Sequence, residues 1–142
     1  FKDNSFGSNI PTKTFNDNTC NVSFMYPESW EEAGFKLPLE ITPDSQVTLN
    51  APNHPSIFSY ICLKGKRPSF EQLVGTEALE GQNNKFKKQH LGGMNWNRWG
   101  PFAYVEKGDM LIVTQMFYTE YDNNPSQEFE SVFRSILGSF KF

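Results

Sequence analysis

The sequence predicts an α+β domain in which a twisted antiparallel sheet is covered by two amphipathic helices, as a two-layer or an α-β-α sandwich. Several segments alternate apolar and polar residues, two later segments repeat apolar residues at helical spacing, and Gly, Pro and Asn separate them. The chain has 142 residues, which is typical of one domain, and 14 Phe, 5 Tyr and 3 Trp supply bulky side chains for its core.

The N-terminal part predicts a tether and then a first strand. Residues 1–19 are polar and Asn-rich without periodicity, so we expect a flexible tether before a single domain over 20–142. Residues 20–26 place Cys, Val, Phe and Tyr on one face of a strand, and the proline that follows ends it. Residues 28–38 are expected to form a turn that carries Trp30 as an aromatic plug.

The middle of the chain predicts two more strands and a helix. Residues 40–49 show a weaker strand pattern, and residues 50–55 are dense in turn formers and predict a surface loop. Residues 57–63 are rich in aromatic and β-branched side chains, which favours a strand. The segment 69–81 begins with a capping box, carries an apolar face and ends at a glycine, so we expect a helix there.

The second half predicts hairpins. Residues 86–99 alternate around Gly92-Gly93, which marks a bulge, a bend or a tight hairpin. The clearest hairpin joins strands over 103–106 and 110–118, because Gly108 in the turn between them can adopt a positive φ.

A closing helix is predicted near the C-terminus. Asn124 or Ser126 can cap it, Gly138 can end it, and residues 139–142 can add a short edge strand. Its apolar residues recur at helical spacing: Phe129, Val132, Phe133, Ile136, Leu137 and Phe140.

The two cysteines bear on the compartment. Cys20 and Cys62 each fall on an aromatic-bearing strand face, so they are either free buried thiols or one disulfide, and a disulfide would imply an oxidising compartment. The chain begins at Phe1 and not at Met, which fits a removed leader as well as a trimmed chain. We expect an extracytoplasmic, periplasmic protein, with a lipid anchor upstream of Phe1 as one possibility.

Charge and hydropathy narrow the partner classes. Thirteen Lys and Arg oppose 16 Asp and Glu, giving a net charge of -3, so nucleic acid is not expected as a partner. The longest apolar stretch is far shorter than the roughly 18 residues of a membrane-spanning helix, so no transmembrane segment is expected.

Residues with catalytic or metal-binding chemistry form no recognisable motif. The only imidazoles belong to His54 and His90, and nucleophile, phosphate-binding, dinucleotide and zinc-protease motifs are absent from the sequence. Glu120–Asn124 gathers oxygen ligands, but its spacing is not that of an EF-hand loop. We therefore expect no enzyme, no metal and no cofactor, with a hydrolase of unrecognised site as the alternative.

Aromatic residues beside polar loops suggest a partner surface, and they include Trp96, Trp99 and Phe102. Trp, Tyr and Arg are common interface anchors. Trp96 and Trp99 are three residues apart in an extended segment, so they should face opposite ways, and we favour Trp99 as the core residue. The loops at 50–55 and 120–124 are the other candidates. The residues expected to contact a partner are Asn53, His54, Trp96, Arg98, Tyr121 and Asp122.

Two short motifs resemble a known family. Phe24-Met-Tyr-Pro-Glu-Ser-Trp30 resembles the F-x-Y-P-x-x-W opening of PsbP-like domains, and the closing helix running into Ser139-Phe140 is similar to their ending. The resemblance covers about residues 20–142 in element order. It implies a fold used mostly for binding other proteins, in photosystem subunits, bacterial periplasmic lipoproteins, type VI effector adaptors and immunity proteins.

These observations lead to one functional hypothesis and two alternatives. We expect a non-catalytic extracytoplasmic protein-binding domain, and more specifically an immunity or inhibitor protein that neutralises a secreted type VI toxin enzyme. One alternative is a small-molecule or lipid carrier lipoprotein, whose aromatic residues would line a pocket between helix and sheet. The other is a cytoplasmic adaptor for a secretion effector, which predicts reduced thiols.

Overall fold

The computed structural model of the chain describes residues 10–33, 43–51, 56–65, 86–99, 102–118 and 127–142. Within these ranges the chain forms nine strands and one helix. They are β1 (Thr12–Asp17), β2 (Val22–Pro27), β3 (Glu31–Glu32), β4 (Ser45–Asn50), β5 (Ser56–Leu63), β6 (Lys87–Leu91), β7 (Met94–Trp99), β8 (Phe102–Lys107), β9 (Met110–Tyr118) and α3 (Gln127–Gly138).

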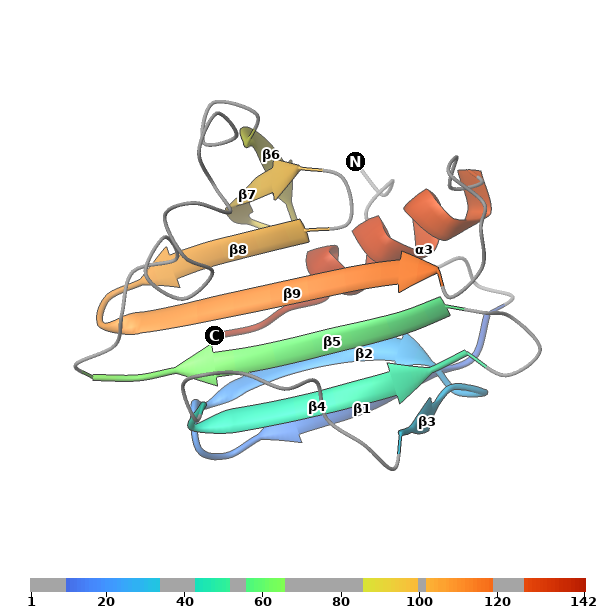
Figure 1. The fold of residues 1–142 in the computed structure, drawn as a ribbon, viewed down its shortest axis with the longest axis horizontal. Coiled ribbons are helices and arrows are strands. Elements are labelled where there is room, and N and C mark those ends of the chain that lie inside the picture. The colour runs from blue at the N-terminus through green and yellow to red at the C-terminus, as the bar shows by residue number, and fades with distance from the viewer. Residues whose placement is uncertain (1–9, 34–42, 52–55, 66–85, 100–101, 119–126) are drawn as a thin grey trace.

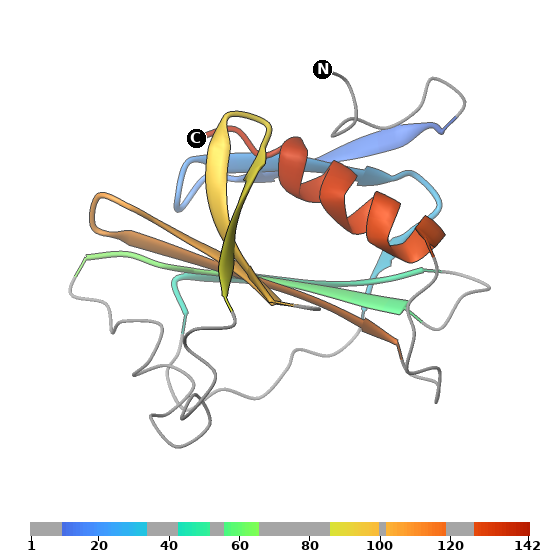
Figure 2. The ribbon, with the colours of Figure 1, turned by 90° about the horizontal axis from the view of Figure 1, so that it is seen from above.

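Seven strands form one antiparallel sheet in the order β3-β4-β5-β9-β8-β7-β6, and β1 and β2 form a separate antiparallel hairpin. The long strands β5 and β9 lie side by side in the middle of the large sheet (Figure 1). Figure 2 shows the β1–β2 hairpin and α3 together on one side of that sheet. The described part of the fold is therefore an α+β sandwich of two layers, and in this it agrees with the sequence. Within the described ranges one helix covers the sheet where two are expected, and the β1–β2 hairpin shares that layer.

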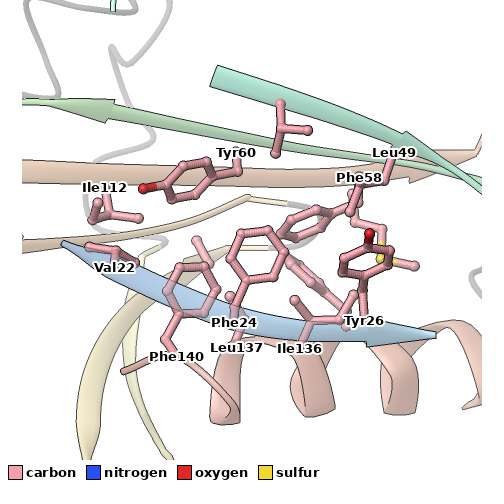
Figure 3. Packing of buried hydrophobic residues seen from close by; sticks show 14 of the residues in the cluster. Val22, Phe24, Tyr26, Leu49, Phe58, Tyr60, Ile112, Ile136, Leu137 and Phe140 are labelled. Atoms are coloured by element: carbon pink, nitrogen blue, oxygen red, sulfur yellow. The ribbon is translucent and has the colours of Figure 1, made fainter. Parts of the chain in front are cut away.

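The core lies between the two layers. Phe24 of β2 is fully buried, and its ring centroid lies 5.5 Å from that of Phe58, 5.3 Å from that of Tyr60 and 4.8 Å from that of Phe140. Figure 3 shows these rings between β2 and the large sheet, together with Ile136 and Leu137 of α3. Alternation along β2 and β5 thus places one face of each strand in a shared aromatic core.

A disulfide joins the two layers. Cys20 lies in the β1–β2 turn and Cys62 near the end of β5, and their sulfur atoms are bonded at 2.08 Å. Of the two states that the sequence left open for these cysteines, the bonded one is found.

The N-terminal expectation needs a correction. The polar composition of residues 1–19 predicts a tether, but Thr12–Asp17 forms β1 and pairs with β2 along its whole length. Only Phe15 contributes a large apolar side chain on the inward face, and the other buried side chain is the polar Asp17. β1 therefore lacks the alternation of apolar and polar residues that predicts a strand, and for this reason its sequence does not indicate one. Residues 1–9 lie outside the described residues.

The other elements agree with the sequence to different degrees. Gly92 and Gly93 form a tight β6–β7 turn, and Trp30 is a buried plug, as expected. The C-terminal residues form a single antiparallel bridge between Lys141 and Ser23 in place of an edge strand. The helix expected over 69–81 and the caps at 124 and 126 lie outside the described residues. No helix within the described ranges has the length and apolar character to cross a membrane.

Candidate binding surface

Trp96 is not available to a partner. Its side chain has no exposed surface, and its ring meets that of Phe140 edge-on at 5.0 Å in the core. The indole Nε1 is buried without a hydrogen-bond partner. The assignment of Trp96 as a contact residue is therefore wrong for this conformation. Parity in the strand gives the relative orientation of the two tryptophans, but not which of them faces the core.

Arg98 holds two elements of the fold together. Its guanidinium donates to the two carboxylate oxygens of Glu130 at 2.6 and 3.0 Å, donates to Gln89 Oε1 at 2.9 Å, and lies 4.4 Å above the ring of Phe133. The side chain of Arg98 is 11% exposed. This bidentate pair fixes α3 against β7, so Arg98 does not serve as an accessible anchor for a partner, in contrast to the expectation.

The remaining candidate contacts lie outside the described residues. They are Asn53 and His54 in the segment between β4 and β5, and Tyr121 and Asp122 in the segment between β9 and α3. They remain predictions.

Trp99 lies on the opposite face of the sheet from Trp96. Together with Phe86, Phe102 and Tyr104 it forms a cluster that we call the outer aromatic group. The Phe86 ring lies 5.7 Å from that of Trp99 and 5.4 Å from that of Tyr104, both edge-on, and the rings of Trp99 and Phe102 stack at 5.9 Å. All four residues are partly exposed.

Strand register builds this group from three neighbouring segments. Trp99 pairs with Phe102 and Asn97 pairs with Tyr104, so the β7–β8 hairpin places these side chains on one face. Leu63 and Leu111 are buried on that face and support Phe86 and Tyr104. Sequence reasoning named Trp99 and Phe102 but missed Phe86 and Tyr104, because their membership depends on the pairing register and not on a local motif.

Polar side chains continue the same face beyond the aromatic residues. Asn97 donates from Nδ2 to the Tyr104 carbonyl at 3.3 Å, and the ring nitrogen Nδ1 of His90 lies 2.9 Å from Asn95 Oδ1 across the β6–β7 pair. His90, Asn95 and Lys88 are exposed. An aromatic centre with a polar, solvated margin is the composition of protein interfaces.

A second cluster of polar chemistry is buried beside the disulfide. Asp17 is 4% exposed, and its Oδ1 accepts the backbone N–H groups of Thr19 at 3.0 Å and Cys20 at 3.2 Å. The Tyr60 hydroxyl donates to Asp17 Oδ2 at 2.6 Å. Burial, this hydrogen bond and the charge of Asp17 together raise the pKa of Tyr60 well above its ordinary value.

This buried cluster resembles a metal-ligand set only in composition. Asp17, Cys20 and Cys62 place one ligand atom each within 4.8 Å of the others, but both sulfur atoms are in the disulfide and offer no thiolate. Both oxygens of Asp17 already accept hydrogen bonds. The disulfide and the hydrogen bonds of Asp17 therefore stabilise the β1–β2 turn.

Comparison with known proteins identifies the fold. No protein-family model and no curated sequence matches the chain. The solution structure of cyanobacterial PsbP (CyanoP) from Synechocystis sp. PCC 6803 is similar with a TM-score of 0.57 and 13% identity over 96% of this chain and 96% of that one. A crystal structure from Bacteroides thetaiotaomicron VPI-5482 is similar with a TM-score of 0.60 and 12% identity over 91% of this chain, which spans 47% of that protein. The chain thus has a PsbP-like fold, as the sequence motifs suggested.

Proposed function

We propose that this PsbP-like domain is a non-catalytic protein-binding domain that works outside the cytoplasm, and that its partner is a secreted toxin enzyme which it neutralises. The observation that carries the proposal is the outer aromatic group with its polar margin. Partly exposed Trp and Tyr side chains held by strand pairing bind with little loss of conformational freedom, which makes them effective anchors.

The compartment is inferred from the disulfide. The Cys20–Cys62 bond and the PsbP-like fold are compatible with an extracytoplasmic location, because disulfides persist in oxidising compartments. An adaptor acting in the cytoplasm would hold these cysteines as thiols, so the bond favours the periplasmic inhibitor over the adaptor.

The carrier alternative needs space between the helix and the sheet. Phe133 and Ile136 of α3 have no exposed surface there, and the Phe133 ring meets that of Phe58 at 6.2 Å. These side chains fill the region in which a bound lipid would lie, which favours protein binding.

The test is affinity capture followed by a matched set of variants. The tagged domain is incubated with envelope and secreted fractions of its source organism, and proteins retained in stoichiometric amounts are identified by mass spectrometry and assayed for an enzymatic activity that the domain inhibits. Trp99→Ala and Phe102→Ala are expected to weaken the complex at least tenfold, since interface aromatic residues carry roughly 2 kcal/mol or more each.

Ser29→Ala is the control, because Ser29 is exposed just after β2, in the other layer, and belongs neither to the outer aromatic group nor to its polar margin. Tyr121→Ala with Asp122→Ala tests the loop contacts separately. If a small molecule is recovered and no protein is, the result would support a small-molecule or lipid carrier instead. Capture of a protein whose affinity is the same for Trp99→Ala and wild type would remove the outer aromatic group from the interface.

A further inference from the structure

Along one side of β1, the backbone hydrogen-bonding groups pair with no other strand among the residues that the structure describes. Glu28 donates its N–H to the Pro11 carbonyl at 2.9 Å, which identifies this pair as hydrogen-bonded. Such pairs recur at every second residue of an antiparallel ladder, so in the β1–β2 register Lys13, Phe15 and Asp17 direct their backbone groups toward β2. The alternate residues direct theirs away from β2: Thr12, Thr14 and Asn16.

The opposite edge of the same hairpin is covered. Ser23 of β2 exchanges two backbone hydrogen bonds with Lys141, at 3.0 and 2.8 Å. The N–H of Met25 donates to the hydroxyl oxygen of Ser139 at 2.8 Å. The single proton of that hydroxyl lies between the Ile136 carbonyl at 2.6 Å and the Met25 carbonyl at 3.3 Å. The C-terminal segment therefore completes β2, while the described residues offer β1 no equivalent strand.

Other sheet edges within the described ranges are protected in familiar ways. β3 is two residues long, and the β6 edge carries the exposed Lys87 and Lys88, whose charges oppose pairing with another strand. β1 has six residues, no proline within it and one charged side chain at its exposed positions, Lys13. Thr14 and Asn16 are exposed as well.

We propose that the outward edge of β1 is a second binding site, which takes an extended segment of the protein partner as an additional β-strand. The proposal rests on the proposed function for the identity of the occupant as another protein. Main-chain hydrogen bonds to Thr12, Thr14 and Asn16 supply the attachment, as in other complexes formed by strand addition.

Two side chains define the chemistry of that segment. Lys13 is exposed on β1, and its Nζ lies 5.7 Å from the centre of the Tyr26 ring. Its positive charge favours an acidic residue opposite it in the added strand over a basic one. Ile10, just before β1, is 43% exposed and is the large apolar side chain most open to solvent in the described ranges. The segment that fits is therefore extended, with a carboxylate near Lys13 and an apolar residue near Ile10.

The test uses random dodecapeptides displayed on phage and selected on the disulfide-bonded domain. Peptides that alternate in polarity and carry a carboxylate are expected, and they should bind Thr14→Pro at least tenfold more weakly than wild type. Proline at 14 removes the outward N–H and obstructs the edge, but it breaks no hydrogen bond to β2. Thr14→Ala keeps the N–H and is expected to bind as wild type does.

Amide hydrogen exchange gives a second readout that needs no variant. In the free domain the amides of Lys13 and Phe15 should exchange more slowly than those of Thr14 and Asn16, and the selected peptide should protect the latter pair. This alternation distinguishes strand addition from binding elsewhere. Asn16→Pro, which also removes an outward N–H, replaces Thr14→Pro if that variant does not fold.

Three results would overturn the proposal. One is the absence of enriched peptides, and another is equal affinity for wild type and Thr14→Pro. The third is a wild-type dimer that Thr14→Pro converts to a monomer in light scattering, because the edge would then be occupied by a second copy of the chain. None of these results depends on the captured partner, so the edge site and the proposed function fail separately.

Discussion

At the scale of single residues, the buried pair of Asp17 and Tyr60 connects the hairpin layer to the large sheet. The Asp17 carboxylate accepts two backbone N–H groups of its own turn and the hydroxyl of Tyr60 on β5. The buried charge of Asp17 depends on all three of these hydrogen bonds. If one of them is lost, part of the carboxylate has neither a polar partner nor water around it, and the folded state is destabilised.

The first prediction concerns alkaline pH. The pKa of Tyr60 in the folded protein is raised above its ordinary value of 10.0 by burial, by the hydrogen bond to Asp17 and by the charge of Asp17. The unfolded chain therefore releases this proton at a lower pH than the folded protein does. The stabilisation that Tyr60 provides is complete below pH 10 and is lost as the pH rises above it, by about 1.4 kcal/mol per pH unit.

Tyr60→Phe isolates this effect. At pH 7 the variant should be less stable than wild type by about 1.5 to 3 kcal/mol, since it loses a hydrogen bond to a charged group. Above pH 10 the difference should shrink, as measured by urea unfolding at successive pH values. The pKa of Tyr26 is also raised, by burial and by the charge of Glu32, but Tyr26 is present in both proteins. A constant difference from pH 7 to 11 would contradict the prediction.

At the scale of elements, the β6–β7 hairpin touches the end of α3 through a glycine. Gly92 has a φ of +59°, and a Cβ built on it would collide with the carbonyl oxygen of Gly138. The hairpin turn is therefore constrained both by its own backbone conformation and by the close approach of the helix terminus.

The second prediction follows from this contact. Gly92→Ala should destabilise the domain by the cost of a left-handed alanine, about 1 to 2 kcal/mol, and by a further cost of about 1 to 3 kcal/mol from the collision. Gly108→Ala in the β8–β9 turn is the matched control, because its φ is +61° and a Cβ there meets nothing within 4 Å. Equal losses of unfolding free energy for the two variants would show that α3 does not approach Gly92 as described.

The third prediction concerns the ion pair that joins β7 to α3. In a double-mutant cycle, Arg98→Met and Glu130→Gln should be coupled by about 1 to 2 kcal/mol, which exceeds the value for exposed pairs because Arg98 is 11% exposed and the contact is bidentate. Arg134→Met with Glu130→Gln serves as the comparison, since that pair is 3.6 Å apart and both side chains are more than a third exposed. A cycle that gives the two pairs equal coupling would contradict this assignment.

Elements with a strong local signal could be predicted from the sequence. Gly108 between alternating segments identified the β8–β9 hairpin, and the apolar spacing up to Gly138 identified α3. β1 could not be predicted in this way, because the polar Asp17 occupies an inward position and one of its hydrogen-bond donors there, Tyr60, lies 43 residues away. The same limitation applies to Trp96, whose burial depends on Phe140.

The candidate surface shows where local reasoning ends. Parity correctly separated Trp96 from Trp99, but Phe86 and Tyr104 join Trp99 only because the strands pair in one particular register. Arg98 looked like an anchor because of its residue type, whereas Glu130, 32 residues later, engages its guanidinium. Some side chains contact residues that lie far away in the sequence, and others are free to bind a partner protein. The sequence alone does not distinguish the two.

At the scale of the whole molecule, the two layers are joined by one covalent bond and a shared aromatic core. The Cys20–Cys62 disulfide connects the β1–β2 turn to β5 across a sequence separation of 42 residues. Hydrogen bonds also tie the layers at the same end, from Tyr60 to Asp17 and from Lys64 Nζ to the Thr19 carbonyl at 2.9 Å. The turn of the hairpin that carries the proposed edge site is therefore held by a covalent bond and two hydrogen bonds, in addition to the packing of β2 in the core.

The final prediction is that the disulfide controls the stability of the whole domain and the order of the β1–β2 hairpin in particular. Loop-closure entropy for 42 residues gives about 4 kcal/mol, so Cys20→Ala with Cys62→Ala should lower the unfolding free energy by about that amount in urea. Because Phe24 still packs against Phe58 and Phe140, the hairpin should stay docked, and its amides should lose more protection near Asp17 than near Met25. Wild-type protein with its disulfide reduced keeps both cysteine side chains and therefore controls for the lost side-chain packing. Uniform loss of protection along β1 and β2 would show that the disulfide does not act locally on the turn.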